Sequence, residues 1–174
     1  MPYLSDGVIV LTPFHPRDAE AHLAGEDADM ERWLSGGPST PEGLAEYIEH
    51  CRQQWETGGP LRQFGIRLEA AQTLVGTIDL RFELPELSDG QVNVAYGLYP
   101  QWRGRGLASR AVELICGYAA DEGAVEAVIR TAVDNPKSKA VARRCGFAYL
   151  GRRLDSDRNP DDWFARRLGP PSGQ

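Results

Sequence analysis

The chain has 174 residues, of which 41% are hydrophobic and 25% charged, and it carries a formal net charge of −6. This length predicts one domain with a hydrophobic core of its own, and the acidic balance argues against non-specific binding of nucleic acid. No apolar run is long enough to span a membrane and the first residues lack a signal-peptide pattern, so we expect a cytoplasmic protein. Cys51, Cys116 and Cys145 are widely spaced and are expected to be reduced thiols in the core.

The predicted elements follow one another in an irregular order. They are a strand over 8–14, helices over 15–25 and 40–55, strands over 62–68, 73–82 and 92–99, a helix over 107–121, a strand over 124–133, a helix over 135–146, and strands over 148–154 and 161–168. This order predicts an α/β (α+β) domain over residues 1–168, with a mixed, mostly antiparallel sheet of about seven strands flanked by about four helices. Residues 169–174 are expected to be a flexible C-terminal tail.

The segment QWRGRGLASRA, which begins at Gln101, places two glycines and two arginines directly before a helical pattern. Gly104 and Gly106 permit positive φ values and leave the backbone open to a ligand, while a helix N-terminus presents N–H groups that attract an anion. Arg103 and Arg105 add positive charge. These features predict either a phosphate-binding turn or a tight turn with packing glycines and solvated arginines.

Two common nucleotide motifs do not fit this segment. A Rossmann fingerprint requires glycine or alanine where this chain has Ser109, and its glycines follow the first strand. A P-loop requires lysine and then serine or threonine where this chain has Leu107 and Ala108. The residues therefore exclude both of these nucleotide sites.

A second segment, NPKSKAVARRCGF, is the other local concentration of positive charge. Asn135 is expected to cap its helix, Pro136 to occupy the first helical position and Gly146 to end it. These roles explain the asparagine and the glycine. They do not explain why two basic helices follow consecutive strands in an acidic protein.

Together, VAYGLYPQWRGRGLASRAV and NPKSKAVARRCGF resemble two motifs of the Gcn5-related N-acetyltransferase (GNAT) superfamily. The first matches a Q/R-x-x-G-x-G/A pattern at Gln101, Gly104 and Gly106, and the second matches an N-x-x-S…G-F pattern from Asn135 to Phe147. The opening residues VIVLTPFHPRDAEAHL are similar to the branch that acetylates ribosomal-protein N-termini. The resemblance covers essentially the whole chain and implies a GNAT-like sheet.

The resemblance implies acetyl-CoA as a co-substrate. The pyrophosphate is expected on the backbone amides of the turn, at Arg103, Gly104, Arg105, Gly106, Leu107 and Ala108, and the pantetheine arm along the strand at Leu98 and Tyr99. Residues of the second motif are expected to flank the cofactor, namely Asn135, Lys137, Ser138 and Arg143. Gly97 would mark a bulge that splays the sheet for the pantetheine arm.

The implied chemistry is direct attack of a neutral amine on the acetyl thioester, with the backbone N–H of Leu98 or Tyr99 binding the developing oxyanion. Many family members carry a tyrosine acid where this chain has Ala142. In the ribosomal-protein branch this role is assigned to the motif serine, here Ser138, which we expect to donate a hydrogen bond to sulfur. The alternative is a first-turn serine that bonds back to Asn135.

The general base is harder to assign. Family members often carry glutamate where this chain has Asn93, and an amide cannot accept the proton. Asp79 is the nearest substitute, and the alternative is an aspartate that faces solvent. Trp33 is expected in the core, with the wall of an acceptor pocket as the alternative. The acidic stretches GEDADMER and DSDRNPDD are expected to be solvated loops, with long-range attraction of a cationic amine as the alternative.

The sequence thus predicts an enzyme that transfers an acetyl group from acetyl-CoA to a primary amine in a ternary complex. The acceptor is a protein N-terminus or a small molecule such as an aminoglycoside. The alternatives are an acyl-CoA-binding regulatory module without catalysis and a transferase for a bulkier acyl group. We expect no metal, since the three histidines lack ligand spacing, and a monomer or homodimer that binds neither nucleic acid nor membrane.

Overall fold

The computed structural model of the protein describes residues 1–170. Its strands are β1 (Leu4–Ser5), β2 (Ile9–Pro13), β3 (Leu61–Leu68), β4 (Leu74–Arg81), β5 (Gln91–Leu98), β6 (Glu126–Ala132), β7 (Ala148–Leu154) and β8 (Pro160–Arg167). Its α-helices are α1 (Ala19–Gly25), α2 (Ala28–Met30), α3 (Pro41–Thr57), α4 (Leu107–Asp121) and α5 (Pro136–Arg144). Two 3-10 helices, η1 (Pro16–Asp18) and η3 (Pro100–Trp102), and a π-helix, η2 (Glu31–Ser35), complete the chain.

All eight strands form one sheet in the order β1-β2-β3-β4-β5-β6-β8-β7. Within residues 1–170, β5 and β6 are the only parallel neighbours, and the other pairs are antiparallel. The predicted mixed, mostly antiparallel α/β class is therefore confirmed. The predicted counts missed β1 and α2, because elements of two and three residues are too short to show a hydrophobic period.

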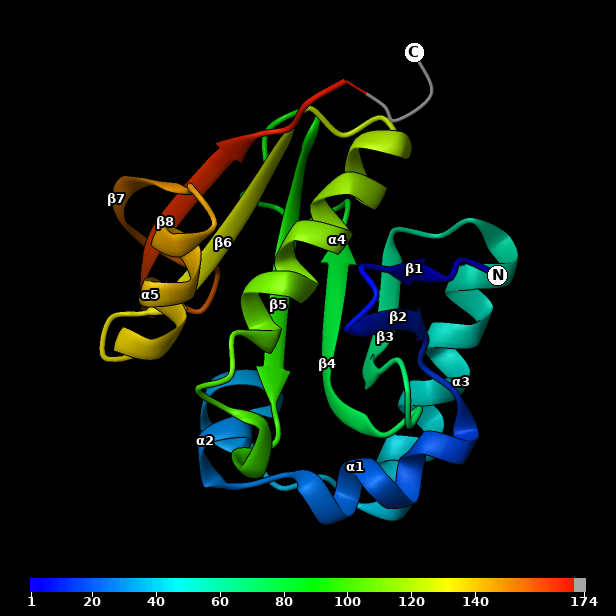
Figure 1. The fold of residues 1–174 in the computed structure, drawn as a ribbon. Coiled ribbons are helices and arrows are strands. Elements are labelled where there is room, and N and C mark those ends of the chain that lie inside the picture. The colour runs from blue at the N-terminus through cyan, green and yellow to red at the C-terminus, as the bar shows by residue number, and fades with distance from the viewer. Residues whose placement is uncertain (171–174) are drawn as a thin grey trace.

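Strands β5 and β6 diverge after a short paired stretch. Their register runs from Gln91 opposite Glu126 to Asn93 opposite Val128, although β5 continues to Leu98. Figure 1 shows the two strands spreading apart toward the starts of α4 and α5. The sheet is therefore open on one side of β5 along its C-terminal half.

The two faces of β5 are covered by different helices. Leu98 packs in the main core with Leu107 and Ala111 of α4. A Cβ added to the neighbouring Gly97 would instead lie 2.3 Å from Leu34 of η2. Because successive strand residues point to opposite faces, α4 covers one face of β5 and the α2–η2 segment covers the other. Helix α3 packs against β3, and α5 packs beside β6 and β7 (Figure 1).

A buried ion pair anchors the chain that leads to α2. Arg67 on β3 donates to Asp18 at 2.6 Å, and these side chains are only 6% and 3% exposed. Arg67 also donates to the hydroxyl of Thr12 at 3.0 Å. Loss of one partner of such a pair leaves an uncompensated buried charge, so the pair fixes the start of α1 on the sheet.

Helix α3 begins and packs as its sequence predicts. The hydroxyl of Thr40 accepts a hydrogen bond from the N–H of Gly43 at 3.1 Å, and Pro41 occupies the first helical position. Leu44, Ile48 and Cys51 are buried on one face. Cys116 and Cys145 are also buried, in the main core.

The C-terminal boundary remains a prediction. The backbone N–H of Leu168 donates to the carbonyl of Val125 at 3.0 Å. The expected tail over 169–174 lies mostly outside the described residues. Among the residues that are described, no helix has the length and apolar character needed to cross a membrane.

Candidate active site

The turn before α4 has the backbone conformation that its glycines permit. Gly104 and Gly106 have φ values of 73° and 76°, in the left-handed region that side chains disfavour. An added Cβ would meet nothing within 4 Å at either residue, so the conformation and not crowding requires glycine. Helix α4 starts at Leu107, directly after Gly106, which has no side chain to cap it. The first N–H groups of α4 lack intrahelical acceptors and can bind an anion.

Helix α5 begins differently. The Oδ1 atom of Asn135 accepts a hydrogen bond from the N–H of Ser138 at 3.1 Å, and Pro136 occupies the first helical position. Gly146, with a φ of 74°, follows the helix. The predicted caps of this helix are confirmed.

A pocket of about 550 Å³ lies between these two helix starts. Its walls come from α2 and η2 on one face of β5, and from the turn, α4 and α5 on the other. The residues that line it are Asp29, Met30, Trp33, Leu34, Tyr96, Gly97, Leu98, Arg103, Gly104, Ala108, Asn135, Lys137, Ser138, Ala140, Val141 and Arg144. The two sequence motifs therefore meet around one pocket that opens on both faces of the divergent strands.

Three further turn residues do not line this pocket with their side chains. Arg105 stacks its guanidinium on Trp102, 5.0 Å from the ring centroid, and Leu107 is buried in the core. Gly106 has no side chain and ends the turn in its left-handed conformation. Any contact of these residues with a ligand would come from their backbone amides.

The backbone of β5 faces the open side of the sheet at alternate residues. The N–H of Tyr99 donates to the carbonyl of Val75 on β4 at 2.9 Å. Because N–H directions alternate along a strand, the N–H groups of Leu98 and Tyr96 point away from β4, toward the gap where β6 no longer pairs. Leu98 thus presents its N–H to the pocket, as does Tyr96, which sequence reasoning missed although it lies two residues before Leu98.

The predicted role of Tyr99 is wrong. Its N–H is bonded to β4, and its carbonyl accepts from the N–H of Trp102 at 2.9 Å. Its side chain is 1% exposed in a separate core cluster, and its hydroxyl lies 2.9 Å from Nδ1 of His22. Tyr99 therefore has neither a backbone group nor a side chain free for a ligand.

The predicted bulge at Gly97 is also absent from the β4–β5 ladder. The register is continuous from Arg81 opposite Asn93 to Gly76 opposite Leu98. The glycine is needed for another reason, since a Cβ there would lie 2.3 Å from Leu34 and 3.3 Å from Met30. The missing side chain lets η2 approach β5 and form one wall of the pocket.

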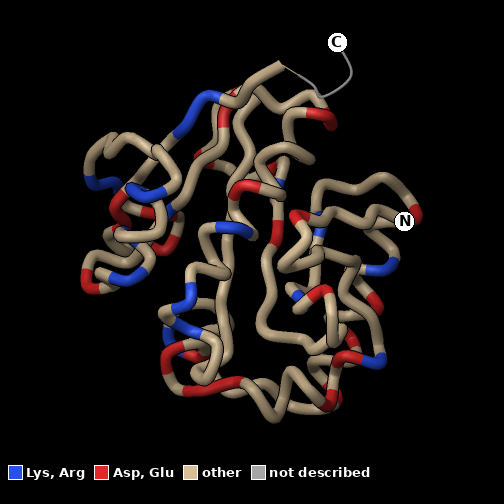
Figure 2. The backbone as a smooth tube through the Cα atoms, viewed as in Figure 1, with Lys and Arg blue, Asp and Glu red and all other residues tan. Residues whose placement is uncertain are grey.

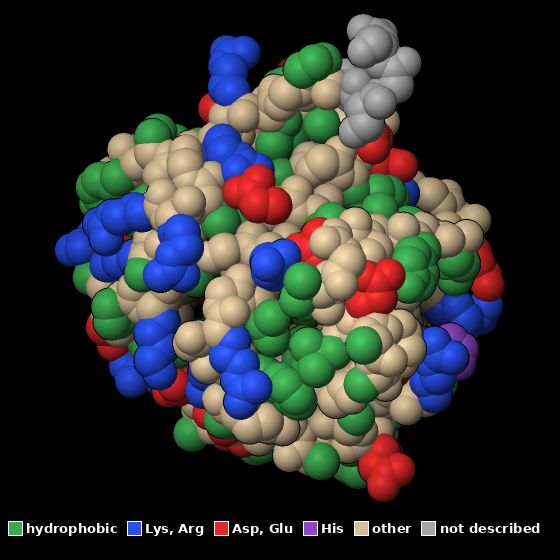
Figure 3. Space-filling view, in the orientation of Figure 1, with side chains coloured by type: hydrophobic (Ala, Val, Ile, Leu, Met, Phe, Trp, Pro, Cys, Tyr) green, Lys and Arg blue, Asp and Glu red, His purple; other side chains and the backbone are tan. Residues whose placement is uncertain are grey.

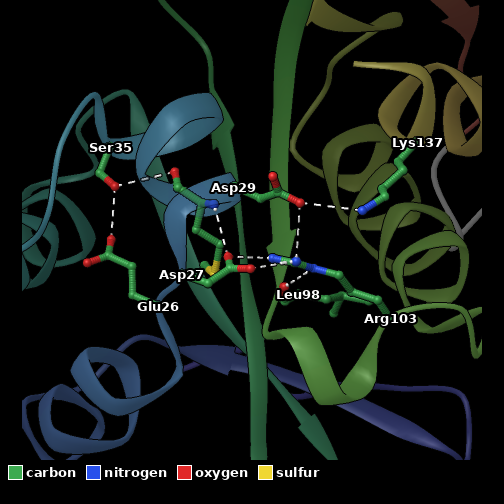
Figure 4. Close-up of polar contacts among 8 residues, drawn as sticks. Glu26, Asp27, Asp29, Ser35, Leu98, Arg103 and Lys137 are labelled. Carbon is green, nitrogen blue, oxygen red and sulfur yellow. Dashed lines mark hydrogen bonds and ion pairs between the residues drawn. The ribbon is translucent and has the colours of Figure 1, made fainter. Parts of the chain in front are cut away.

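Carboxylates of the α2 segment hold Arg103 and Lys137. Arg103 donates to the two carboxylate oxygens of Asp27 at 2.7 and 2.8 Å and, through Nε, to the carbonyl of Leu98 at 2.9 Å (Figure 4). Asp29 lies 3.5 Å from Arg103 and 3.4 Å from Lys137. The Arg103 hydrogen bonds lower the pKa of Asp27 below its ordinary value. Arg103 therefore ties the turn to α2 across the pocket.

This pairing corrects the expectation for the acidic stretch GEDADMER. Its aspartates are ion-paired, and Glu26 accepts hydrogen bonds from Ser35 and from the backbone and side chain of Ser39. Acidic and basic positions lie side by side at this corner of the fold in Figure 2. The stretch is a structural part of the pocket wall and not a solvated loop.

The pocket face of α5 follows helical periodicity. The residues on it are Lys137, Ser138, Ala140, Val141 and Arg144. Arg143 points elsewhere, with its guanidinium 5.5 Å from the ring centroid of Phe164. The role of Arg143 remains a prediction, and Arg144, two helical turns after Lys137, is the arginine that lines the pocket. A helical-wheel argument on this segment would have found it.

Ser138 lies at the pocket and inside the cap of α5, and its hydrogen bond to sulfur remains a prediction. Its N–H bonds back to Asn135, while its hydroxyl lines the pocket 3.1 Å from the hydroxyl of Tyr96. The same phenol lies 3.1 Å from the carbonyl of Ser138. Burial raises the pKa of the Tyr96 phenol above its ordinary value, so the phenol stays protonated. Ala142 is fully buried in the core and presents nothing to the pocket.

Asp79 is buried beside the pocket but does not line it. It lies opposite Ala95 on β5, is 8% exposed, and accepts a hydrogen bond from Nε of Arg81 at 3.3 Å. Burial raises the pKa of its carboxyl to about 6, against the opposing effect of Arg81. The alternative of a solvent-facing aspartate is therefore wrong. On the same face of β5, the Oδ1 atom of Asn93 is buried without a hydrogen-bond partner in residues 1–170.

Trp33 lies in the pocket wall and not in the core. Its side chain is half-buried, and the guanidinium of Arg32 stacks 4.1 Å from its ring centroid. With Met30 and Leu34 it forms an apolar wall opposite α5. Sequence reasoning missed Met30 and Leu34 because a three-residue helix followed by a π-helix has no regular period. Within residues 1–170 no group of three His, Cys, Asp or Glu side chains is placed to hold a metal ion.

A family model for the acetyltransferase (GNAT) domain matches residues 9–148. The chain belongs to the GNAT acetyltransferase family. It is an acetyl-CoA-dependent N-acetyltransferase. No curated protein sequence matches the chain.

Solved structures share the GNAT fold over almost the whole chain at low sequence identity. One is the acetyl transferase from Salmonella typhimurium that modifies the N-terminal serine of ribosomal protein L7/L12, with a TM-score of 0.81, 19% identity and coverage of 97% of this chain and 100% of that one. Another is RimL, a ribosomal L7/L12 α-N-protein acetyltransferase in complex with coenzyme A, with a TM-score of 0.80, 17% identity and coverage of 96% and 98%. A third is the microcin C7 self-immunity acetyltransferase MccE in complex with acetyl-CoA and AMP, with a TM-score of 0.77, 18% identity and coverage of 94% of each chain.

The pocket fits the co-substrate of a GNAT enzyme. The turn offers backbone N–H groups for a pyrophosphate, and β5 offers an unpaired edge for an amide-containing arm such as pantetheine. Lys137 and Arg144 add positive charge on α5. Figure 3 shows Lys and Arg side chains gathered over α5 and the start of α4, in a protein whose net charge is −6.

Proposed function

We propose that this GNAT enzyme acetylates a primary amine, either a protein N-terminus or a small molecule, by direct attack in a ternary complex. One observation carries the proposal: the pocket has walls on both faces of β5, at the place where β5 and β6 diverge. A donor held by α4 and α5 on one face can therefore meet an acceptor that enters beside α2 and η2 on the other. Direct transfer requires that donor and acceptor be held together in one site, with the reacting atoms close and aligned.

On the donor side, the backbone does most of the binding. The N–H groups of residues 103–108 would hold the pyrophosphate, with Lys137 and Arg144 in reach of phosphate charge. The edge of β5 at Leu98 and Tyr96 would pair with pantetheine. Bound there, acetyl-CoA supplies a thioester as the electrophile, and an N–H of this edge would bind the oxyanion that develops.

On the acceptor side, two buried oxygen acceptors lie on neighbouring strands. Asp79 is opposite Ala95, and Asn93 is opposite Arg81, so the two side chains are diagonal neighbours on one face of the sheet. An ammonium group has three donors and no acceptor, which matches a carboxylate beside an unpartnered amide oxygen. We propose that Asp79 accepts, through water, the proton that the amine must lose, and that Asn93 orients the amine.

The pKa of Asp79 sets the expected pH dependence. With a pKa of about 6, the carboxylate is mostly ionised at neutral pH and can accept a proton. The rate should therefore rise as the pH increases through about 6. A protein N-terminus is a suitable acceptor, because its ordinary pKa of about 8 leaves a useful neutral fraction that a lysine side chain lacks.

An amine panel with acetyl-CoA tests the proposal, with free thiol as the readout. The panel contains peptides with free N-terminal serine or alanine, the same peptides with blocked N-termini and one lysine, and small polyamines including aminoglycosides. We expect turnover with at least one free primary amine. For that amine, Asp79→Asn should lower kcat by about tenfold or more and remove the rise near pH 6. CoA binding without turnover on any amine would favour a regulatory module, and turnover only with longer acyl-CoA donors would favour a bulkier acyl group.

The structural likeness to enzymes that modify ribosomal L7/L12 places protein N-termini first in the panel. It also supports our proposal of a cytoplasmic location, which the sequence predicted. A monomer or homodimer that binds no nucleic acid remains our expectation. Sedimentation of the purified protein with and without DNA measures both.

A further inference from the structure

We infer that Tyr96 is a positioning residue that directs the hydroxyl proton of Ser138 toward the sulfur of CoA, an inference that rests on the proposed function. The two hydroxyls lie 3.1 Å apart on adjoining walls of the pocket, Tyr96 on β5 and Ser138 in the first turn of α5. Neither the sequence motifs nor the family match assigns Tyr96 a role.

Of the polar groups of Ser138, the hydroxyl is the one that can rotate. Its N–H donates to Asn135, and its carbonyl lies in the first turn of α5, 3.1 Å from the hydroxyl of Tyr96. The Asn135 cap thus fixes the backbone of Ser138 in the first turn of α5. A hydroxyl on such a fixed backbone has few orientations to lose when it binds a ligand atom.

The phenol of Tyr96 has one proton and two acceptors within reach. When it donates to the carbonyl of Ser138, its oxygen can accept the serine proton, which then points away from the pocket. When it donates to Oγ of Ser138, the serine proton is free to point into the pocket. The second arrangement also strengthens the serine as a donor, because hydrogen bonds in a chain polarise one another.

This arrangement stabilises charge on sulfur without proton transfer from Ser138 or Tyr96. When the C–S bond breaks, its electron pair remains on sulfur, and the hydrogen bond from Ser138 stabilises that negative charge. The proton lost by the amine leaves through Asp79 or water. Burial keeps the Tyr96 phenol protonated, so it acts as a donor throughout.

The pKa of the CoA thiol in its complex with the enzyme tests the inference without any turnover. Thiolate absorbance is followed while the pH is raised, for the wild type, Tyr96→Phe, Ser138→Ala and the double variant. In the wild-type complex we expect a thiol pKa below that of free CoA titrated in parallel. Ser138→Ala should raise it by about one pH unit and Tyr96→Phe by about half a unit, while the double variant should match Ser138→Ala.

Tyr3→Phe is the matched control, because it also removes one phenolic hydrogen bond, at 3.3 Å to Glu69, from an exposed side chain just before the edge strand β1. It should leave the thiol pKa unchanged. The inference is overturned if Tyr96→Phe leaves the thiol pKa at the wild-type value, or if its shift adds in full to that of Ser138→Ala. Thermal unfolding and CoA affinity confirm that each variant folds and binds.

The two proposals can fail separately. A lowered thiol pKa that depends on Tyr96, in an enzyme that acetylates no amine, supports the inference and contradicts the proposed function. If an amine is acetylated and Tyr96→Phe leaves kcat unchanged, the proposed function is supported and the inference is contradicted. If both proposals hold, Tyr96→Phe should lower kcat by about threefold and leave KM for acetyl-CoA nearly unchanged.

Discussion

Two helices begin at the same pocket in opposite ways. Helix α4 begins after Gly106, which has a φ of 76° and no side chain, whereas α5 begins after Asn135, whose side chain accepts a hydrogen bond from Ser138. The first N–H groups of α4 are left for an external anion, and an N–H of α5 is already satisfied by its own cap. We therefore propose that the cofactor phosphates bind at α4, while α5 contributes side chains such as Lys137 and Arg144.

This difference gives the two motifs different chemical roles. The turn before α4 works through its backbone, and its arginine Arg103 is engaged by Asp27 and the carbonyl of Leu98. The start of α5 works through a fixed backbone that presents the Ser138 hydroxyl. In our proposal, binding of phosphate and stabilisation of sulfur are thus divided between the two helix starts.

The largest expected effect comes from a carboxylate in the backbone-binding turn. Gly104→Asp should lower CoA affinity by about 100-fold or more, because it combines a strained left-handed residue with a negative charge beside the pyrophosphate. Calorimetric titration with CoA measures the loss. Gly104→Ala separates the two causes, since it retains the strain, finds open space around its Cβ and adds no charge. Normal affinity in the aspartate variant would show that the phosphate binds elsewhere.

A smaller effect tests whether Arg103 acts as a clamp or as a phosphate ligand. Arg103→Ala should lower stability by about 1–2 kcal/mol and CoA affinity by a few fold, because the turn loses its tie to α2. If Arg103 is a clamp, Asp27→Asn should reproduce most of both losses and the double variant should add little. If Arg103 binds phosphate directly, Asp27→Asn should free it and leave CoA affinity unchanged or higher.

Arg105→Ala is the comparison variant for this clamp. It removes the same charge two residues later from a side chain that stacks on Trp102 and is exposed. We expect its stability to stay within about 0.5 kcal/mol of the wild type. Chemical denaturation of the four variants in parallel measures the difference between the paired and the solvated arginine.

Local signals in the sequence predicted the helix starts and the fold class well. The conformations of the left-handed glycines, the asparagine cap and Pro136 depend on only about four or five neighbouring residues. The turn and α5 could therefore be placed from sequence. The alternation of N–H directions along β5 could also be used, but it needs one observation from the structure. It would have shown that Tyr99 faces away from the gap once the pairing of Tyr99 with Val75 was known.

The remaining parts of the site depend on long-range contacts. The pairing of Asp27 with Arg103 joins residues 76 positions apart, and the contact of Tyr96 with Ser138 joins residues 42 apart. The wall formed by η2 exists because Gly97 has no side chain, which a single sequence suggests only as an irregular strand. The burial of Asp79, and hence its pKa of about 6, follows from strand order and not from its neighbours in sequence.

The smallest expected effect on binding lies at the start of α5. Asn135→Ala should lower stability by about 1 kcal/mol, the usual cost of an N-cap, and change CoA affinity by less than about threefold, because the side chain is engaged by Ser138. Asn135→Ser, which retains a capping oxygen, should recover most of that stability. A loss of CoA affinity of about tenfold in both variants would make Asn135 a direct ligand. In that case α5, like α4, would bind the cofactor at its N-terminus, and the contrast between the two helix starts would no longer hold.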